Sequence, residues 1–480
     1  MKGNGEMPPL PQKIDLAIGT TTATKKKRII KSSVLIFFAF ATAFYSRIFC
    51  TLTRAPSILN FLHFATVGFA VVVALVSSRS RDRKQIAIVR ALLIGIFTLF
   101  GSMLVSALVN NAGLVNVIFN FLILGEPFIF LLAMISIPVS SATLQQWKKW
   151  FVISACINLI LAIAQKFLLS AGLLAAVADS SLRSVDRGQQ DATDGVQGVF
   201  FMTGAGAYVS AAVTVSFALY IFFYVKSLPL WLRLLGLLGA VYQILLSDTK
   251  QVVLTSALAW MLLGLSQTQN AKKFLMYATC IVLAIAAFIW AAYNLEAFEV
   301  YKYWFSRSDV YENSDTGGLA VKMQGIHMVL AHWRSPLNWL FGLGPGHTLG
   351  RLGGWSIKEY WSLLSPLGAT DPPFYDEIWK FIRGNWIAMT TTLYVPLFSW
   401  AGIWGDLGWF GLGTYLYLGF IVWRNLCLDD LSRFLVLTVA VYGFFLTQME
   451  EPGFMLSIAA LIGLRWHEKR QLSQMTRKIT

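Results

Sequence analysis

Apolar runs long enough to cross a lipid bilayer dominate this sequence of 480 residues. A spanning helix needs roughly 20 mostly apolar residues, because no backbone polar group can stay unpaired in lipid. With 56% of its residues apolar and only 13% charged, the chain has too little polar surface for a soluble globule. We therefore predict an all-α integral membrane protein with about twelve transmembrane helices. The twelve runs are 34–52, 58–76, 90–109, 114–136, 149–169, 199–224, 229–247, 252–266, 274–294, 402–423, 433–448 and 453–466.

Basic residues predict how these helices are oriented, since cytoplasmic loops are enriched in Lys and Arg. The tail carries five basic residues between Lys25 and Lys31, and every second connection after it has its own cluster. Both termini are therefore expected in the cytoplasm of a multi-pass membrane protein. The net charge of +15 comes from these scattered clusters, which argues against nucleic acid as a partner.

Two extracytoplasmic segments are longer than connectors, whose median length is about 4–6 residues. The larger one follows the ninth helix and is expected to be helical. Four cysteines without paired or metal-ligand spacing predict neither a disulfide nor a metal site. The predicted parts are a basic cytoplasmic tail (1–33), helices one to nine (34–294, with an outer loop at 170–198), the large outer loop (295–401), helices ten to twelve (402–466) and a cytoplasmic tail (467–480).

Apolar spacing predicts two amphipathic helices inside the large loop. The first spans 319–333, with Met323, Ile326 and Leu330 on its apolar face. The second spans 375–387, and its apolar residues are Ile378, Trp379, Ile382 and Trp386.

Three alternate glycines, Gly342, Gly344 and Gly346, lie between these helices and rule out a regular helix there. Glycine permits a tight turn and the close approach of a ligand to the backbone. His347 follows the turn directly and is our candidate catalytic base, since its ordinary pKa lies near neutrality. The loop is also rich in tryptophan, which is consistent either with an interfacial aromatic belt or with stacking on sugar rings.

Three motifs resemble the O-antigen ligase and O-antigen polymerase superfamily of membrane glycosyltransferases. Residues 334–346, ending in F-G-L-G-P-G, are similar to the family's P-L-x-G-x-G-x-G element in the same loop. Residues 405–412 resemble its acidic E-x-G-x-x-G entry to the tenth helix, and residues 247–251 its S/T-x-S-R/K element, with Lys250 at the basic position. The number of helices and the place of the large loop match as well.

Some polymerases of this family carry an Arg, ten residues and then a Gly in two outer loops. Arg187 with Gly198 and Arg307 with Gly318 have that spacing here. Ligases typically have a His about eleven residues before the glycine of the tenth-helix entry, whereas Leu397 stands at that distance from Gly408. The resemblance therefore favours polymerisation over ligation.

The resemblance implies transfer of a glycan from undecaprenyl diphosphate to a lipid-linked repeat unit at the periplasmic face of a bacterial inner membrane. The diphosphate would be bound by Arg187, Lys250 and Arg307, because cations stabilise a leaving diphosphate. The glycine turn would contact the substrate. No nucleotide-binding motif is present, and neither a metal nor another cofactor is expected. Membrane lipids, a chain-length regulator and a flippase are the other implied partners. Carboxylates remain alternatives as the base, namely Asp309, Glu312, Asp315, Asp371, Asp376, Glu377 and Asp406.

Two other classes of function fit some of these features. Twelve helices with cytoplasmic ends also describe many transporters, including flippases of lipid-linked oligosaccharides. Many transporters consist of two repeated halves with the longest loop on the cytoplasmic side, unlike the arrangement predicted here. A noncatalytic scaffold would predict that substitution of Arg187 or Lys250 has no effect.

Overall fold

The computed structural model describes residues 32–77, 82–171, 196–200, 206–267, 271–295, 302 and 317–479. These residues contain helices and turns but no strand. Six helices are long and apolar enough to cross a membrane. They are α1 (Ser32–Thr53), α2 (Leu62–Ser77, preceded by the short helix η1, Ser57–Phe61), α3 (Arg83–Asn110), α4 (Leu114–Ser136), α5 (Ser141–Ser170) and α6 (Gly206–Tyr224).

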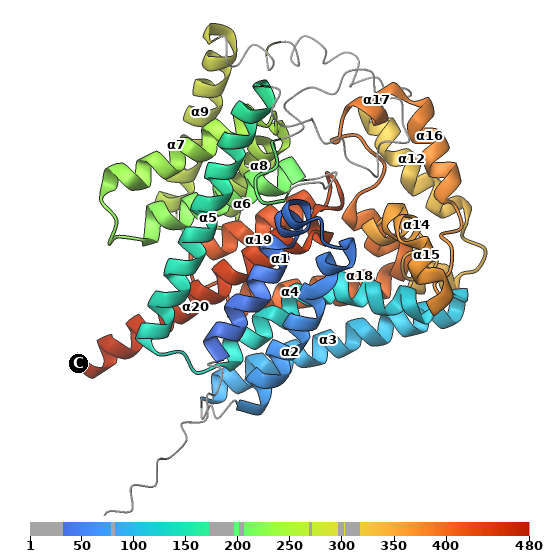
Figure 1. Cartoon of the computed structure of the whole chain (residues 1–480), viewed down its shortest axis with the longest axis horizontal. Helices are drawn as coiled ribbons and strands as arrows, with labels where there is room; N and C mark the ends of the chain where they lie inside the picture. Colours follow the sequence, from blue (N-terminus) through green and yellow to red (C-terminus); the bar gives the residue numbers. More distant parts are fainter. Residues whose placement is uncertain are drawn as a thin grey trace, which may run out of the picture. The chain divides into compact units, whose positions relative to one another are not determined.

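Six further helices coincide with the remaining apolar runs (Figure 1). They are α7 (Leu230–Leu246), α8 (Lys250–Ser266), α9 (Ala271–Asn294), α18 (Ser399–Asn425), α19 (Asp430–Tyr442) and α20 (Pro452–Ile479). A helix thus occupies each of the twelve predicted runs wholly or in part, and the chain is a helical membrane protein. The number of helices that cross the bilayer and their orientation stay predictions.

Several helices extend beyond their apolar runs. The first helical residue of α3 is Arg83, where the carboxylate of Asp82 caps the helix by accepting the amide of Lys84 at 2.9 Å. In the same way, α20 runs through most of the predicted tail 467–480. Hydropathy marks only the apolar part of a helix, and polar residues with good helix propensity continue it.

The core of the bundle lies around α20, which packs against α1, α4, α5, α6 and α19. Every residue of α20 from Gly453 to His467 is buried. A helix that is apolar on all sides is expected to be buried in this way. The outer helices instead expose large apolar side chains, such as Phe97 and Leu108 of α3, to the surroundings that lipid would occupy.

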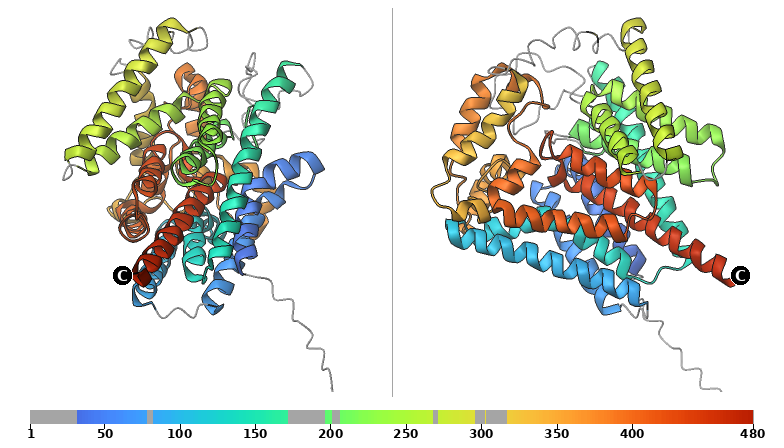
Figure 2. Two further views of the ribbon diagram at one scale, coloured as in Figure 1. Left: turned by 90° about the vertical axis from the view of Figure 1, so that its left-hand side faces the viewer. Right: turned by 180° about the vertical axis from the view of Figure 1, so that it is seen from behind.

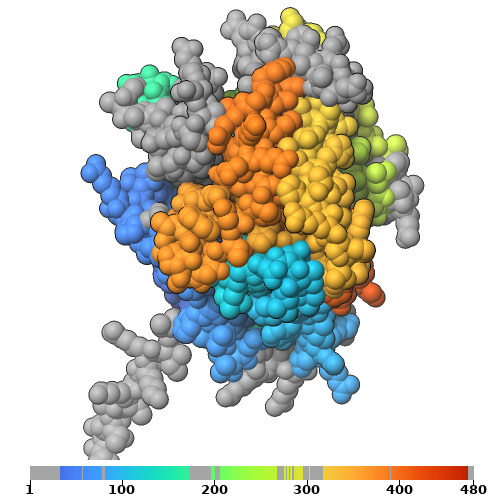
Figure 3. Space-filling view, turned by 90° about the vertical axis from the view of Figure 1, so that its right-hand side faces the viewer, coloured from blue at the N-terminus to red at the C-terminus, as the bar shows by residue number. Residues whose placement is uncertain are grey.

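The large loop folds into short helices that pack on the membrane helices. Figure 2 shows α18 lying along α3, and in Figure 3 the yellow and orange loop segments lie beside the cyan segment around residues 110–115. There the amide of Gly113 donates to the hydroxyl of Thr370 at 2.9 Å, which fastens the loop to the start of α4. Its described helices are α12 (Gly318–Ala331), α13 (Leu337–Phe341), η3 (Leu352–Ser356), α14 (Ile357–Glu359), α15 (Trp361–Leu364), η4 (Ser365–Leu367), α16 (Tyr375–Gly384) and α17 (Trp386–Thr390).

The predicted apolar face of the first loop helix is only partly right, because Ile326 packs against the core of the loop but other predicted members do not. Met323 and Leu330 are each 37% exposed in α12, whereas Val321, Gly325 and Met328 are buried. A Cβ atom at Gly325 would lie 2.7 Å from the carbonyl oxygen of Pro396, so the helix docks through its glycine. A pattern of large apolar residues does not register such a contact.

The second loop helix follows the prediction more closely. Ile378, Trp379 and Ile382 of α16 are buried. Trp386, predicted on the same face, begins the separate helix α17 and is exposed.

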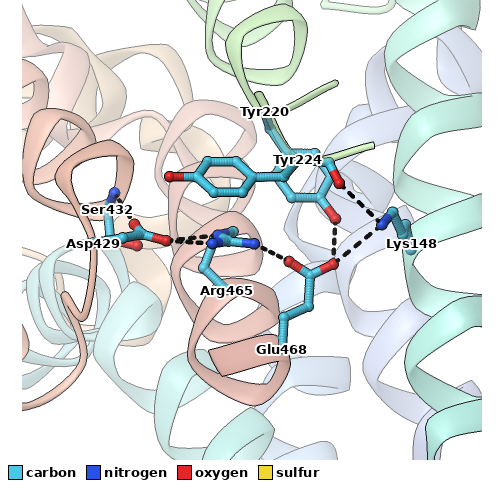
Figure 4. Close-up of polar contacts among 7 residues, drawn as sticks. All are labelled: Lys148, Tyr220, Tyr224, Asp429, Ser432, Arg465 and Glu468. Carbon is cyan, nitrogen blue, oxygen red and sulfur yellow. Dashed lines mark hydrogen bonds and ion pairs between the residues drawn. The ribbon is translucent and has the colours of Figure 1, made fainter. Parts of the chain in front are cut away.

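One end of the bundle is closed by a cluster of polar residues around Arg465 of α20 (Figure 4). The guanidinium of Arg465 contacts Asp429 with Nε at 2.7 Å and Nη2 at 2.6 Å, pairs with Glu468, and lies 3.3 Å from the centre of the Tyr224 ring. The cluster joins α5, α6, α20 and the connection before α19. Its members are Lys148, Tyr220, Tyr224, Asp429, Ser432, Arg465 and Glu468.

We expect Arg465→Ala to destabilise the protein much more than Arg470→Ala, a substitution in the same helix. Removing one partner of a buried ion pair costs about 3–5 kcal/mol, whereas an exposed pair contributes about 0–1 kcal/mol. The side chains of Arg465 and Asp429 are 5% and 7% exposed, against 25% and 40% for the pair Arg470 and Asp82. Thermal unfolding in detergent measures the difference, and equal Tm values for the two variants would contradict the structural role of the cluster.

Candidate functional site

The glycine turn of the large loop is wrapped around one buried carboxylate, that of Asp406 in α18. One oxygen of Asp406 accepts the amide and the hydroxyl of Thr348 at 2.8 and 2.6 Å. The other oxygen accepts hydrogen bonds from the backbone amide of Gly346 and from the side-chain amide of Asn120, both at 2.8 Å. The backbone carbonyl of Asp406 accepts the amide of Gly344 at 3.0 Å. Asp406 therefore anchors the turn.

Two glycines with positive φ allow this contact. Gly342 has φ 66°, and a Cβ atom there would lie 2.4 Å from the carbonyl carbon of Asp406. Gly408 has φ 65°, and a Cβ there would lie 2.4 Å from the carbonyl carbon of Leu340. Gly408 also interrupts the regular geometry of α18. At both positions the backbones of the loop and of α18 lie so close together that no side chain fits between them. Only glycine permits this approach.

The predicted substrate-binding glycines thus contact the protein itself. The backbone amides of Gly344 and Gly346 both donate hydrogen bonds to Asp406. His347 is buried, with Nδ1 hydrogen-bonded to the Leu343 carbonyl at 2.9 Å and Nε2 to the hydroxyl of Thr370 at 2.8 Å. Burial lowers the pKa of His347 below its ordinary value. Its catalytic role and the substrate role of the glycines stay predictions.

Of the three predicted cations, Lys250 alone lies within the described residues, so their grouping at one site stays a prediction. Lys250 is the first residue of α8 and pairs with Asp248 at 3.2 Å. Arg187 and Arg307 lie outside the residues that the structure describes.

A cavity lies elsewhere, where the large loop meets the ends of α1, α2, α4 and α20. Its volume is about 60 Å³, and it is partly open to solvent. Each of these helices contributes the end that the basic residues predict to be extracytoplasmic. One wall is aromatic, with the rings of Phe61, Phe64 and Phe119 packed within 6.5 Å of one another. The remaining lining is largely polar and charged.

Arg351 brings the loop to this cavity three residues after the anchored Thr348. Its guanidinium pairs with the carboxylate of Glu451, and its backbone amide donates to Glu450 Oε2 at 2.7 Å. Burial raises the pKa of Glu450 to about 8. Glu450 is therefore largely protonated at neutral pH, so the pair of Arg351 and Glu451 carries no net charge beside it.

Arg47 of α1 supplies an uncompensated positive charge to the cavity. It is half-buried, and no carboxylate pairs with its guanidinium among the described residues. A guanidinium in this state is suited to bind an anion, because its planar fork matches phosphate oxygens.

A histidine that lines the cavity contacts a buried glutamate behind it. His63, near the start of α2, has its Nδ1 2.6 Å from Glu126 Oε1 in the middle of α4. Both side chains are buried, at 4% and 2% exposure, and His63 lines the cavity. Ionisable residues inside membrane helices are costly and usually functional.

Sequence reasoning missed every one of these residues. The cavity draws on six separate parts of the chain, and none of them forms a motif by itself. Glu126 did carry a usable signal, since it is the one charged residue in the run 114–136. His63 lies in a similar apolar run.

Comparison with known proteins does not place the chain in a family. No protein-family model matches the sequence, and no curated protein shows a significant match.

We expect Asp406→Asn to lower the free energy of unfolding by about 2–5 kcal/mol. An asparagine accepts with only one atom, so at least two of the four donors lose their acceptor, and each buried unpaired donor costs about 1–3 kcal/mol. The control is Asp371→Asn, since Asp371 pairs with Lys358 at a half-exposed site. A lower Tm for Asp406→Asn alone is the expected result, whereas an unchanged Tm would show that the turn does not depend on this carboxylate.

We expect Glu450→Gln to become more stabilising as the pH rises. The folded-state pKa of Glu450, about 8, lies above its ordinary value of 4.5, so the wild type loses stability as the pH rises through 8. Glutamine stays neutral and keeps an acceptor for the Arg351 amide. The Tm of the variant minus that of the wild type should be near zero at pH 5 and several degrees at pH 9. An equal difference at both values would contradict the raised pKa.

Proposed function

We propose that the protein is a surface-polysaccharide polymerase of a bacterial inner membrane. It transfers a growing glycan from undecaprenyl diphosphate to a new lipid-linked repeat unit at the periplasmic face and releases the lipid diphosphate. The resemblance of the glycine turn, of the tenth-helix entry and of the Lys250 element to the O-antigen polymerases motivates this proposal. A chain-length regulator and a flippase are its expected protein partners.

The observation that carries the proposal is the cavity between the large loop and the membrane helices. A lipid-linked glycan has an apolar carrier, a charged diphosphate and a hydroxyl-rich sugar, so its site must offer all three environments. The aromatic wall of Phe61, Phe64 and Phe119 suits the first, and Arg47 suits the second. Other polar side chains of the cavity suit the third.

In this proposal Arg47 stabilises negative charge on the leaving diphosphate. The resemblance assigns the same role to Arg187, Lys250 and Arg307, although Lys250 does not line the cavity. Hydrogen bonds from a guanidinium to phosphate oxygens strengthen as charge develops on the leaving oxygen, and this difference accelerates the reaction. The proposal uses no metal and no other cofactor.

The test is deletion of the gene in its native host, followed by complementation. Deletion should leave surface glycan of single-repeat length, and the wild-type gene should restore long polymer. Arg47→Ala should lower the polymerisation rate about 10–100-fold, since a hydrogen bond to a charged group contributes about 1.5–3 kcal/mol. Arg54→Ala is the matched control, because Arg54 is exposed at the same end of α1 and does not line the cavity.

Other results would contradict the proposal. Long polymer that persists after deletion would exclude polymerisation. Full-length polymer that accumulates on its lipid carrier would indicate a ligase, and lipid-linked units that remain on the cytoplasmic side would indicate a flippase.

A further inference from the structure

We propose that His63 is the catalytic base that takes the proton from the acceptor sugar, and that Glu126 positions its imidazole. This inference rests on the proposed function and names the acceptor site within the same cavity. The geometry of the pair and the unpartnered polar atoms beside it point to this role.

The pair has the arrangement in which a carboxylate fixes the tautomer of a histidine. Glu126 accepts Nδ1–H of His63 at 2.6 Å, which leaves Nε2 as the atom with a lone pair. No described residue hydrogen-bonds to Nε2 of His63, and the residue lines the cavity. Glu126 also stabilises the imidazolium that forms when Nε2 accepts a proton.

Two further polar atoms of the cavity lack a partner within the described part of the chain. They are Oδ1 of Asn60 and Oε1 of Glu450, and both side chains are more than nine-tenths buried. A buried polar atom without a hydrogen bond costs about 1–3 kcal/mol, so a ligand that supplies partners is expected to bind there. Sugar hydroxyls both donate and accept, and they therefore suit the amide oxygen of Asn60 and the carboxyl of Glu450 alike.

The other histidines are less suited to the role. The sequence contains five histidines, and His63 is the only one that lines the cavity. His347 uses both ring nitrogens within the loop, and His467 bonds the Met134 carbonyl at 3.0 Å. His332 resembles His63 in facing a glutamate, Glu377, but its Nε2 is 3.7 Å away and the pair lies outside the cavity.

The proposed step balances without a further reagent. Nε2 of His63 takes the proton of the acceptor hydroxyl, and the oxygen's electron pair forms a bond to the anomeric carbon of the donor glycan. The bond from that carbon to the diphosphate oxygen breaks, and its electron pair leaves with undecaprenyl diphosphate. The imidazolium then returns its proton to water.

The test uses the purified full-length protein and the lipid-linked repeat unit isolated from the deletion strain. His63→Gln should slow chain extension about 10²–10⁴-fold, the usual contribution of a general base. Glutamine can still donate a hydrogen bond to Glu126, so the Tm should stay near that of wild type, and the affinity for undecaprenyl diphosphate should stay within twofold. The matched control His332→Gln should extend chains at the wild-type rate.

A second pair of measurements separates chemistry from folding. His63→Ala should regain activity when imidazole is added, which a structural histidine would not do. Glu126→Gln should lower the maximal rate at an unchanged KM, because the carboxylate no longer fixes the orientation and tautomer of the His63 imidazole. The ionisable groups that share this cavity are Arg47, Arg351, Glu359, Glu450 and Glu451, and they are unchanged in both variants.

The outcomes distinguish failure of the two proposals. If the wild-type protein extends no chain, the proposed function fails. If the wild type extends chains and His63→Gln does so within threefold of its rate, His63 is not the base and the proposed function stands. Loss of activity together with loss of undecaprenyl diphosphate binding or of thermal stability, without rescue by imidazole, would overturn the inference and assign His63 a structural role.

Discussion

The carboxylate of Asp406 is the interaction on which the outer half of this structure depends. Its four hydrogen bonds hold the backbone from Gly346 to Thr348 against α18. Three residues later the chain delivers Arg351 to the cavity, where Glu450 and Glu451 receive it. The glycines serve this anchorage, since side chains at Gly342 would collide with the backbone of α18. The described part of the large loop is thereby held on the membrane helices at a buried point, in addition to the contact of Thr370 with Gly113.

Charge pairing explains where the remaining ionisable groups lie. Desolvation of an ion costs several kcal/mol, so buried charges persist only with a partner and further hydrogen bonds. Arg465 satisfies this condition with Asp429, Glu468 and the Tyr224 ring at one end of the bundle. At the cavity, Arg351 satisfies it with Glu451. Arg47 and the unpartnered polar atoms of the cavity lack such partners among the described residues. A ligand that supplies the missing partners could therefore bind there.

The sequence predicted the helices far better than the site. Long apolar runs determine a membrane helix almost alone, and for this reason 114–136 matches α4 at both ends. Close packing of a backbone at a glycine leaves no pattern of apolar residues in the sequence. The buried face of α12 around Gly325 was therefore predicted only in part. The cavity combines single residues such as Arg47, His63 and Arg351 from distant segments, and their proximity follows only from tertiary packing. The predicted cations Arg187 and Arg307 lie outside the described residues and remain predictions.

The depth of the cavity follows from the substrate that the proposal assigns to it. A polyprenyl chain gains about 0.8 kcal/mol for each methylene that stays buried, so the proposed enzyme could not lift its carrier far from the bilayer. The sugars, in contrast, are stable only where their hydroxyls are hydrogen-bonded. The reacting bond must therefore lie at the boundary between the two environments. In the proposal, the helix ends bearing Arg47 and His63 and the loop that carries Arg351 provide this boundary. If His63 is the base, Glu126 of α4 holds its ring at this boundary through a contact within the membrane helices.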